Sequence, residues 1–139
     1  MASRNERNLA IIEEFRENKG QVGGRYADMP LLLLSTIGAR TRDIRTNPLA
    51  YLNHDSQFII FASKGGAPTN PDWFYNLKAN PIVTVEVGEE KFSAEATILF
   101  GEERDSIFTL QSSQHKQFAE YQHKTTRTIP VVALQRIKS

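Results

Sequence analysis

The sequence predicts a small antiparallel β-barrel of about six strands with peripheral helices. Apolar segments with strand-like alternation are joined mostly by short turns, which only antiparallel neighbours can use. No regular strand–helix–strand alternation, as a parallel sheet requires, is visible. Because the chain has only 139 residues, an open sheet of this kind would leave costly unpaired edges, and curling into a barrel removes them.

The first predicted element is a helix over residues 4–19. Ser3 and Glu6 have the spacing of a capping box, and Gly20 supplies a stop. Between them, apolar residues recur at helical intervals at Leu9, Ile12 and Phe15. A glycine-rich loop then leads to Pro30, and the apolar segment 31–36 predicts a buried strand.

The middle of the chain predicts a strand pair followed by a helix. Residues 44–52 and 58–62 are predicted to be strands, joined by a turn at 53–56. Asn70-Pro71-Asp72 then predicts a helix start, with the Asn70 side chain accepting hydrogen bonds from free backbone donors. This helix is expected to end before Asn80-Pro81.

The clearest hairpin follows, with alternating residues in 83–87 and 92–98 and a turn at 88–90. Residues 102–113 and 116–122 then predict two helices. An apolar strand over 129–137 is expected to close the sheet.

Composition limits the classes of function. The hydrophobic content of 40% and charged content of 24% fit one globular domain, which we divide into an N-terminal helix (1–19) and a barrel domain (20–139). The absence of cysteine excludes disulfides, thiolate metal sites and a cysteine nucleophile. A net charge of +1 supplies no global field toward nucleic acid or an anionic membrane.

The same properties predict a cytoplasmic protein. The N-terminal residues lack a signal-peptide pattern, and the longest apolar run, 29–34, is far shorter than the roughly 20 residues that span a bilayer. In the helix 4–19, three acids on the polar side oppose binding to anionic lipid: Glu13, Glu14 and Glu17. Peripheral membrane contact is therefore not expected.

A local cluster of cations is the most unusual chemical feature. Arg40, Arg42, Arg45 and Lys64 lie in two segments that bracket one predicted strand pair. Lys64 opens a Lys-Gly-Gly turn, whose glycines allow close backbone approach, and the helix start at Asn70 follows. A phosphate-bearing ligand suits this combination, whereas solvated loop cations beside an ordinary turn are the alternative.

Sequence motifs for self-contained catalysis are absent. Neither of the common glycine-rich nucleotide motifs occurs. The three histidines, His54, His115 and His123, have no metal-ligand spacing, and no nucleophilic serine motif is present. An enzyme of this kind can still catalyse redox chemistry when a bound cofactor carries the reaction. Trp73 is either part of such a site or a core residue.

Several motifs in order resemble the deazaflavin-dependent nitroreductase family of actinobacteria. They cover roughly residues 20 to 135 and are Leu32-Leu33-Leu34-Ser35-Thr36-Ile37-Gly38-Ala39-Arg40, Arg45-Thr46-Asn47-Pro48-Leu49, Ala62-Ser63-Lys64-Gly65-Gly66, Asn70-Pro71-Asp72-Trp73-Phe74-Tyr75-Asn76-Leu77-Lys78-Ala79-Asn80-Pro81, Glu120-Tyr121-Gln122 and Arg127-Thr128-Ile129-Pro130-Val131-Val132. The resemblance implies a split β-barrel related to flavin-mononucleotide-binding reductases. It also implies the deazaflavin coenzyme F-420, whose reduced form delivers hydride from C5.

The resemblance further implies which residues line the coenzyme site. Arg45 and Lys64 are assigned mainly to phosphate charge, with Arg40 assisting, and the backbone of 62–64 to the polar edge of the deazaflavin ring. Arg42 stands where the family usually has a small residue. The full set implied is Arg40, Thr41, Arg45, Thr46, Asn47, Pro48, Leu49, Ala62, Ser63, Lys64, Trp73 and Asn76.

The acceptor is expected beside the segment 115–121. Family members that reduce nitroimidazoles, quinones or furanocoumarins carry several tyrosines there, whereas this chain has Tyr121 alone, with His115 and Phe118 at positions that can be tyrosine. These three residues are the substrate-pocket candidates, and His115 is a candidate proton donor. The expected acceptor is a quinone, an enone or a nitro compound.

Two alternatives share the same barrel. One is a reductase that uses flavin mononucleotide, and the other is a protein that binds coenzyme F-420 without turnover. A homodimer is expected on the analogy of small split barrels. No metal is expected.

Overall fold

The computed structural model describes residues 4–23 and 29–137, with side chains from residue 7 onward. The predicted capping box at Ser3 and Glu6 lies outside the described residues and side chains. The elements are α1 (Arg4–Glu17), β1 (Leu31–Ile37), β2 (Ile44–Ala50), β3 (Leu52–His54), β4 (Gln57–Phe61), the 3-10 turn η2 (Lys64–Gly66), α2 (Asp72–Ala79), β5 (Ile82–Val87), β6 (Glu90–Ile98), α3 (Gly101–Gln114), α4 (Gln117–Lys124) and β7 (Val131–Arg136).

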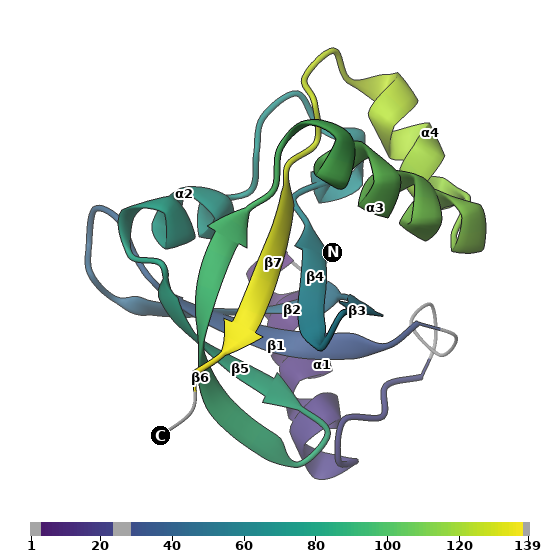
Figure 1. The fold of residues 1–139 in the computed structure, drawn as a ribbon. Coiled ribbons are helices and arrows are strands. Elements are labelled where there is room, and N and C mark those ends of the chain that lie inside the picture. Colours follow the sequence, from purple (N-terminus) through teal and green to yellow (C-terminus); the bar gives the residue numbers. More distant parts are fainter. Residues whose placement is uncertain (1–3, 24–28, 138–139) are drawn as a thin grey trace.

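The described strands form one antiparallel sheet in the order β2-β1-β5-β6-β7-β4-β3. Its two edge strands, β2 and β3, follow each other in the chain and are separated only by Tyr51. The sheet must therefore curl to bring its edges toward each other, which confirms the predicted barrel (Figure 1). The prediction of a single strand over 44–52 is wrong. The strand is interrupted at Tyr51, whose N–H donates to the carbonyl of Pro30 (3.2 Å), and the two parts lie at opposite edges of a seven-stranded sheet.

Strand β1 shows why the apolar runs of this sequence are continuous. Leu32 and Leu34 belong to the cluster inside the barrel, whereas Leu31 and Leu33 pack against Ile12 and Phe15 of α1 on the outside. Since successive side chains of a strand point to opposite faces, a strand covered on both sides needs apolar residues at every position. Strands β4 and β7 are covered on both faces in the same way.

Three helical layers cover the barrel (Figure 1). Helix α1 packs on the outer face of β1, where Arg16 also pairs with Glu86 of β5 (2.8 Å). Helix α2 contributes Trp73, Phe74 and Leu77 to the interior cluster. Helices α3 and α4 lie together at the end of the sheet where β7 begins, and cover the outer face of β4 and β7.

Most predicted boundaries are confirmed within one or two residues, including the β5–β6 hairpin and the helices α1 to α4. The expected turn at 53–56 is shorter, because β3 and β4 continue to a two-residue turn at Asp55 and Ser56, both with positive φ (50° and 65°). The predicted capping by Asn70 is wrong. Pro71 is the N-cap of α2 without a side-chain bond, and the Asn70 amide oxygen instead accepts a hydrogen bond from Arg127 (2.7 Å).

Within the described residues, no helix is long and apolar enough to cross a membrane.

Candidate functional site

The β1–β2 turn presents three predicted cations to solvent. Gly38 begins it, with its N–H donating to the carbonyl of Asp43 (2.7 Å) and its carbonyl accepting from Arg42 (2.9 Å). A Cβ on Gly38 would lie 2.8 Å from Oγ1 of Thr41 and 3.2 Å from the carbonyl oxygen of Asp43, so a larger residue here would displace the Thr41 side chain. Thr41 is exposed, and its hydroxyl accepts from the Asp43 N–H (3.2 Å). None of the exposed guanidinium groups of Arg40, Arg42 and Arg45 is ion-paired with a carboxylate of the described residues.

Strand β2 divides the predicted run 45–49 between two faces. Residues directly opposite in antiparallel strands share a face, so Arg45, Asn47 and Leu49 share the inner face of β1 with Thr36, Leu34 and Leu32. Thr46 and Pro48 share the outer face, where the Thr46 hydroxyl is hydrogen-bonded to that of Ser35 (2.8 Å). Only the first group faces the side on which α2 packs. Pro48 is tolerated because β2 is an edge strand.

Helix α2 links this turn to the barrel interior through Asn76. The side-chain amide of Asn76, which is buried, donates to Oγ1 of Thr36 (3.1 Å), and its oxygen accepts from the backbone N–H of Ala39 (2.9 Å). Asn76 therefore holds the β1–β2 turn against α2. Trp73 is only 5% exposed and lies in the interior cluster, so it acts as a core residue in this structure.

The chain after β4 folds into a turn with a continuous series of special backbone angles. Ser63 has right-handed helical angles (φ −75°, ψ −41°), and positive φ follows at Lys64 (48°), Gly65 (63°) and Gly66 (84°). A right-handed residue followed by a left-handed one makes successive N–H groups converge, which forms a concavity for anionic or carbonyl oxygen. The N–H groups of Ser63, Lys64 and Gly65 donate to no acceptor among the described residues.

The predicted glycine turn lies against α4, and the approach of a ligand to its backbone stays a prediction. A Cβ on Gly66 would lie 2.9 Å from the carbonyl oxygen of Tyr121 and 2.9 Å from Cβ of Lys124. Gly65 has open space around its Cβ position, so only its positive φ favours glycine there. The turn is thus seated beneath α4. Lys64, half-buried, has Nζ 3.4 Å from Oγ1 of Thr69 and no ion pair to a described carboxylate.

The predicted cation cluster is therefore two groups. Arg40, Arg42 and Arg45 belong to the β1–β2 turn and the start of β2, beside the later part of α2, whereas Lys64 lies beneath α4. In the view of Figure 1, α2 lies between the loop that joins β1 to β2 and the helices α3 and α4. A ligand that contacts both groups must extend past α2.

The three residues predicted for the acceptor lie together at the end of α3 and on α4: His115 is the C-cap of α3, and Phe118 and Tyr121 belong to α4. The ring of Phe118 packs edge-on against three other rings. The distances between ring centroids are 5.4 Å to Phe61, 5.5 Å to Tyr121 and 6.5 Å to His115. Phe118 is only 5% exposed, so its buried ring packs against the rings of His115 and Tyr121 without being accessible itself. His115 and Tyr121 are half-buried and remain the accessible members of the group.

Arg127 was not among the site residues predicted from the sequence. Its guanidinium donates to the carbonyls of Ala62 (3.1 Å), Ser63 (2.8 Å) and Ala67 (2.9 Å), and to the Asn70 amide oxygen (2.7 Å). Burial lowers the pKa of Arg127 from its usual value. The one feature of the sequence that pointed to Arg127 was its place at the start of the family motif 127–132, just before the last strand.

Comparison with known proteins completes the assignment. The model of the F420H(2)-dependent quinone reductase family matches residues 9–136. This chain belongs to that family. A relative named F420H(2)-dependent quinone reductase Rv1261c, from Mycobacterium tuberculosis, is 38% identical over 126 residues, which cover 88% of this chain and 85% of the relative.

Two solved structures support the family assignment. One, described as an F420-H2 dependent reductase (FDR-A), has a TM-score of 0.69 and 38% identity, and the match covers 76% of this chain and 94% of that one. A second, described as a domain-swapped dimer, has a TM-score of 0.72 and 35% identity over 91% of this chain and 96% of that one. The resemblance to deazaflavin-dependent reductases and the split-barrel fold are thus confirmed.

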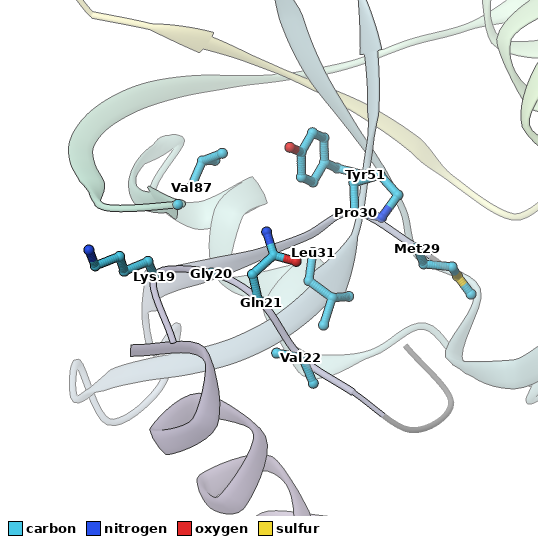
Figure 2. A pocket seen from close by; sticks show the side chains of 10 residues that line it. Lys19, Gly20, Gln21, Val22, Met29, Pro30, Leu31, Tyr51 and Val87 are labelled. Carbon is cyan, nitrogen blue, oxygen red and sulfur yellow. The ribbon is translucent and has the colours of Figure 1, made fainter. Parts of the chain in front are cut away.

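A separate cavity of the structure is lined by none of the residues predicted for the coenzyme or acceptor site. It has a volume of about 230 Å³ and lies between the chain after α1, the start of β1 and the β5–β6 turn. Figure 2 shows Tyr51 and Val87 on one side of it and Leu31 and Val22 on the other. Among its described lining residues the one cationic side chain, Lys19, is paired with Glu89 (3.6 Å), so these residues offer no unpaired cation to a phosphate group.

Proposed function

We propose that this chain binds reduced coenzyme F-420 along the surface between the β1–β2 turn and the Ser63–Gly65 turn, and reduces a quinone. Membership of the F420H(2)-dependent quinone reductase family makes the protein an oxidoreductase. The observation that carries the placement is the Ser63–Gly65 turn, where three converging N–H groups without a described acceptor lie next to a cation. Such donors fit a ligand with anionic and carbonyl oxygens.

The residues present suit an extended, anionic coenzyme. The backbone of Ala62–Lys64 would hold the polar edge of the deazaflavin ring. Arg45 and Lys64 would bind phosphate charge from two sides of α2, with Arg40 assisting, and their long side chains suit this reach. Thr41, Asn47, Leu49 and Asn76 would complete the lining on the side of α2, whereas Thr46, Pro48 and Trp73 act through packing.

The chemistry needs little from the protein beyond binding and orientation. When bound, the reduced coenzyme supplies a hydride from C5. The protein holds the acceptor against the ring face, which accounts for much of the rate. His115 and Tyr121 are placed to contact the acceptor, since they are the accessible members of the aromatic group around Phe118. We propose His115 as the proton donor, with solvent as the other source.

Titration of the purified protein tests the cofactor. F-420 and flavin mononucleotide are added in parallel, and binding is followed by ligand fluorescence and by the fluorescence of Trp73, the only tryptophan. We expect saturable binding of F-420 alone, followed by oxidation of reduced F-420 when a quinone is added. Preference for flavin mononucleotide would overturn the coenzyme assignment. Binding of F-420 without oxidation by any quinone, enone or nitro compound would indicate a binding protein.

Two further expectations belong to this proposal. We propose that copies of the chain form a homodimer, which light scattering on the purified protein tests. We also propose a cytoplasmic location, with which the absence of cysteine is compatible. Fractionation of producing cells tests it.

A further inference from the structure

Arg127, which lies between α4 and β7, directs all the hydrogen bonds of its guanidinium to one distant segment of the chain. All four of its acceptors lie within residues 62–70, which precede it in the chain by 57 to 65 positions. Three acceptors are backbone carbonyls and the fourth is an amide oxygen, so no described carboxylate neutralises the guanidinium. Arginine keeps its charge in proteins, and its positive charge therefore remains beside this segment.

The orientation of two peptide groups follows from these contacts. In a trans peptide, the C=O and the following N–H point in opposite directions, and the described chain has no cis peptide. The carbonyls of Ala62 and Ser63 point toward Arg127. The N–H groups of Ser63 and Lys64 must then point away from it. These are two of the three converging donors assigned above to the coenzyme.

We propose that Arg127 is a positioning residue for coenzyme binding. It holds the carbonyls of Ala62, Ser63 and Ala67 on its own side, so that the N–H groups of Ser63 and Lys64 face the ligand. Its unneutralised charge adds attraction for the anionic coenzyme from behind the turn. This inference rests on the proposed function, and it assigns no direct contact between Arg127 and the ligand.

Arg104 provides a matched control, because it is a second arginine whose guanidinium makes several hydrogen bonds near α4. Its guanidinium donates to the carbonyl of Ile129 (2.7 Å), to the side chain of Gln122 (3.0 Å) and to Asp105 (3.0 Å), and it lies over the Phe108 ring. It thus anchors α3 to α4 and to the residues before β7. It makes no hydrogen bond to the segment 62–70. Loss of either arginine should lower stability, but of the two only Arg127 bonds directly to the turn.

The test compares Arg127→Ala, Arg104→Ala and the unchanged protein. Amide hydrogen exchange without coenzyme reports on Gly66 and Ala67, whose N–H groups donate within the turn to Ser63 and Lys64. We expect faster exchange of these two amides in Arg127→Ala alone. We also expect its Kd for F-420 to rise by about tenfold or more, as for loss of a charged hydrogen-bonding group, and by much less in Arg104→Ala.

Chemical rescue separates positioning from general destabilisation. A non-denaturing concentration of guanidinium chloride should restore part of the F-420 affinity of Arg127→Ala but not that of Arg104→Ala, with sodium chloride at equal ionic strength as the reference. The inference is overturned if Gly66 and Ala67 exchange as before in Arg127→Ala, or if both variants lose affinity equally without rescue. If the unchanged protein binds no F-420, the proposed function fails, and this outcome is distinct from a failure of Arg127 alone.

Discussion

The side-chain amide of Asn76 on α2 donates a hydrogen bond to Oγ1 of Thr36 on β1, at 3.1 Å, and both residues are buried. The other end of the Asn76 amide holds the N–H of Ala39. One polar side chain therefore connects the helix, the strand and the turn that presents the arginines. The position of those arginines depends on it.

Removal of either partner should destabilise the fold. We expect Asn76→Ala and Thr36→Val each to lower the free energy of unfolding by about 1 to 3 kcal/mol, because a buried polar group loses its partner. The double variant should lose less than the sum of the two. Urea unfolding measures all three, with Thr97→Val, at an exposed strand position, as a control that should change little. Full additivity would contradict the coupling.

The two glycines of the Lys-Gly-Gly turn should respond differently to alanine. Gly65→Ala should cost about 1 to 2 kcal/mol from its positive φ alone, since nothing lies near its Cβ position. Gly66→Ala adds the clash with α4, and overpacking of this kind typically costs about 1 to 3 kcal/mol more. Chemical denaturation compares the two. Equal losses would show that α4 moves away without cost.

The two main phosphate cations should each contribute to coenzyme affinity. Arg45→Ala and Lys64→Ala should each weaken F-420 binding by about 1.5 to 3 kcal/mol, as expected for a lost charge-assisted contact. Fluorescence titration gives the Kd of each variant. Lys91→Ala removes an exposed cation from β6 and should leave the Kd unchanged. Unchanged affinity in both Arg45→Ala and Lys64→Ala would disprove the phosphate placement.

Tyr51 predicts a loss of stability at alkaline pH. Burial raises the pKa of Tyr51 above its usual value of 10.0, so the folded state keeps the proton to a higher pH than the unfolded state does. The stability contributed by this difference is present below pH 10 and is lost as the pH rises through the folded pKa. Between neutral pH and pH values above 10, the Tyr51→Phe variant should therefore lose less free energy of unfolding than the unchanged protein does. Urea unfolding of the variant and of the unchanged protein at each pH measures the difference, and parallel loss of stability in both would contradict the assignment to Tyr51.

Local sequence patterns predicted most of the elements correctly. The alternation in the β5–β6 hairpin and the helical spacing of Leu9, Ile12 and Phe15 depend only on near neighbours, so they can be read along the chain. The continuous apolar run of β1 likewise indicated a strand covered on both faces. The family could also be identified from motifs, because these keep their order and spacing along the sequence.

Contacts between distant segments decided what the patterns could not. The break at Tyr51 depends on Pro30, the need for glycine at position 66 depends on α4, and the acceptors of Arg127 lie far back in the chain. Asn70 looked like a helix cap because its sequence neighbours allow one, yet Arg127 competes for the same oxygen. The sequence by itself thus determined most of the strands, the helices, the family and the candidate cations. Only the tertiary structure decided which N–H groups of the Ser63–Gly65 turn have no acceptor among the described residues and which residue holds the neighbouring carbonyls, because hydrogen-bond partners so far apart in the chain leave no local periodicity.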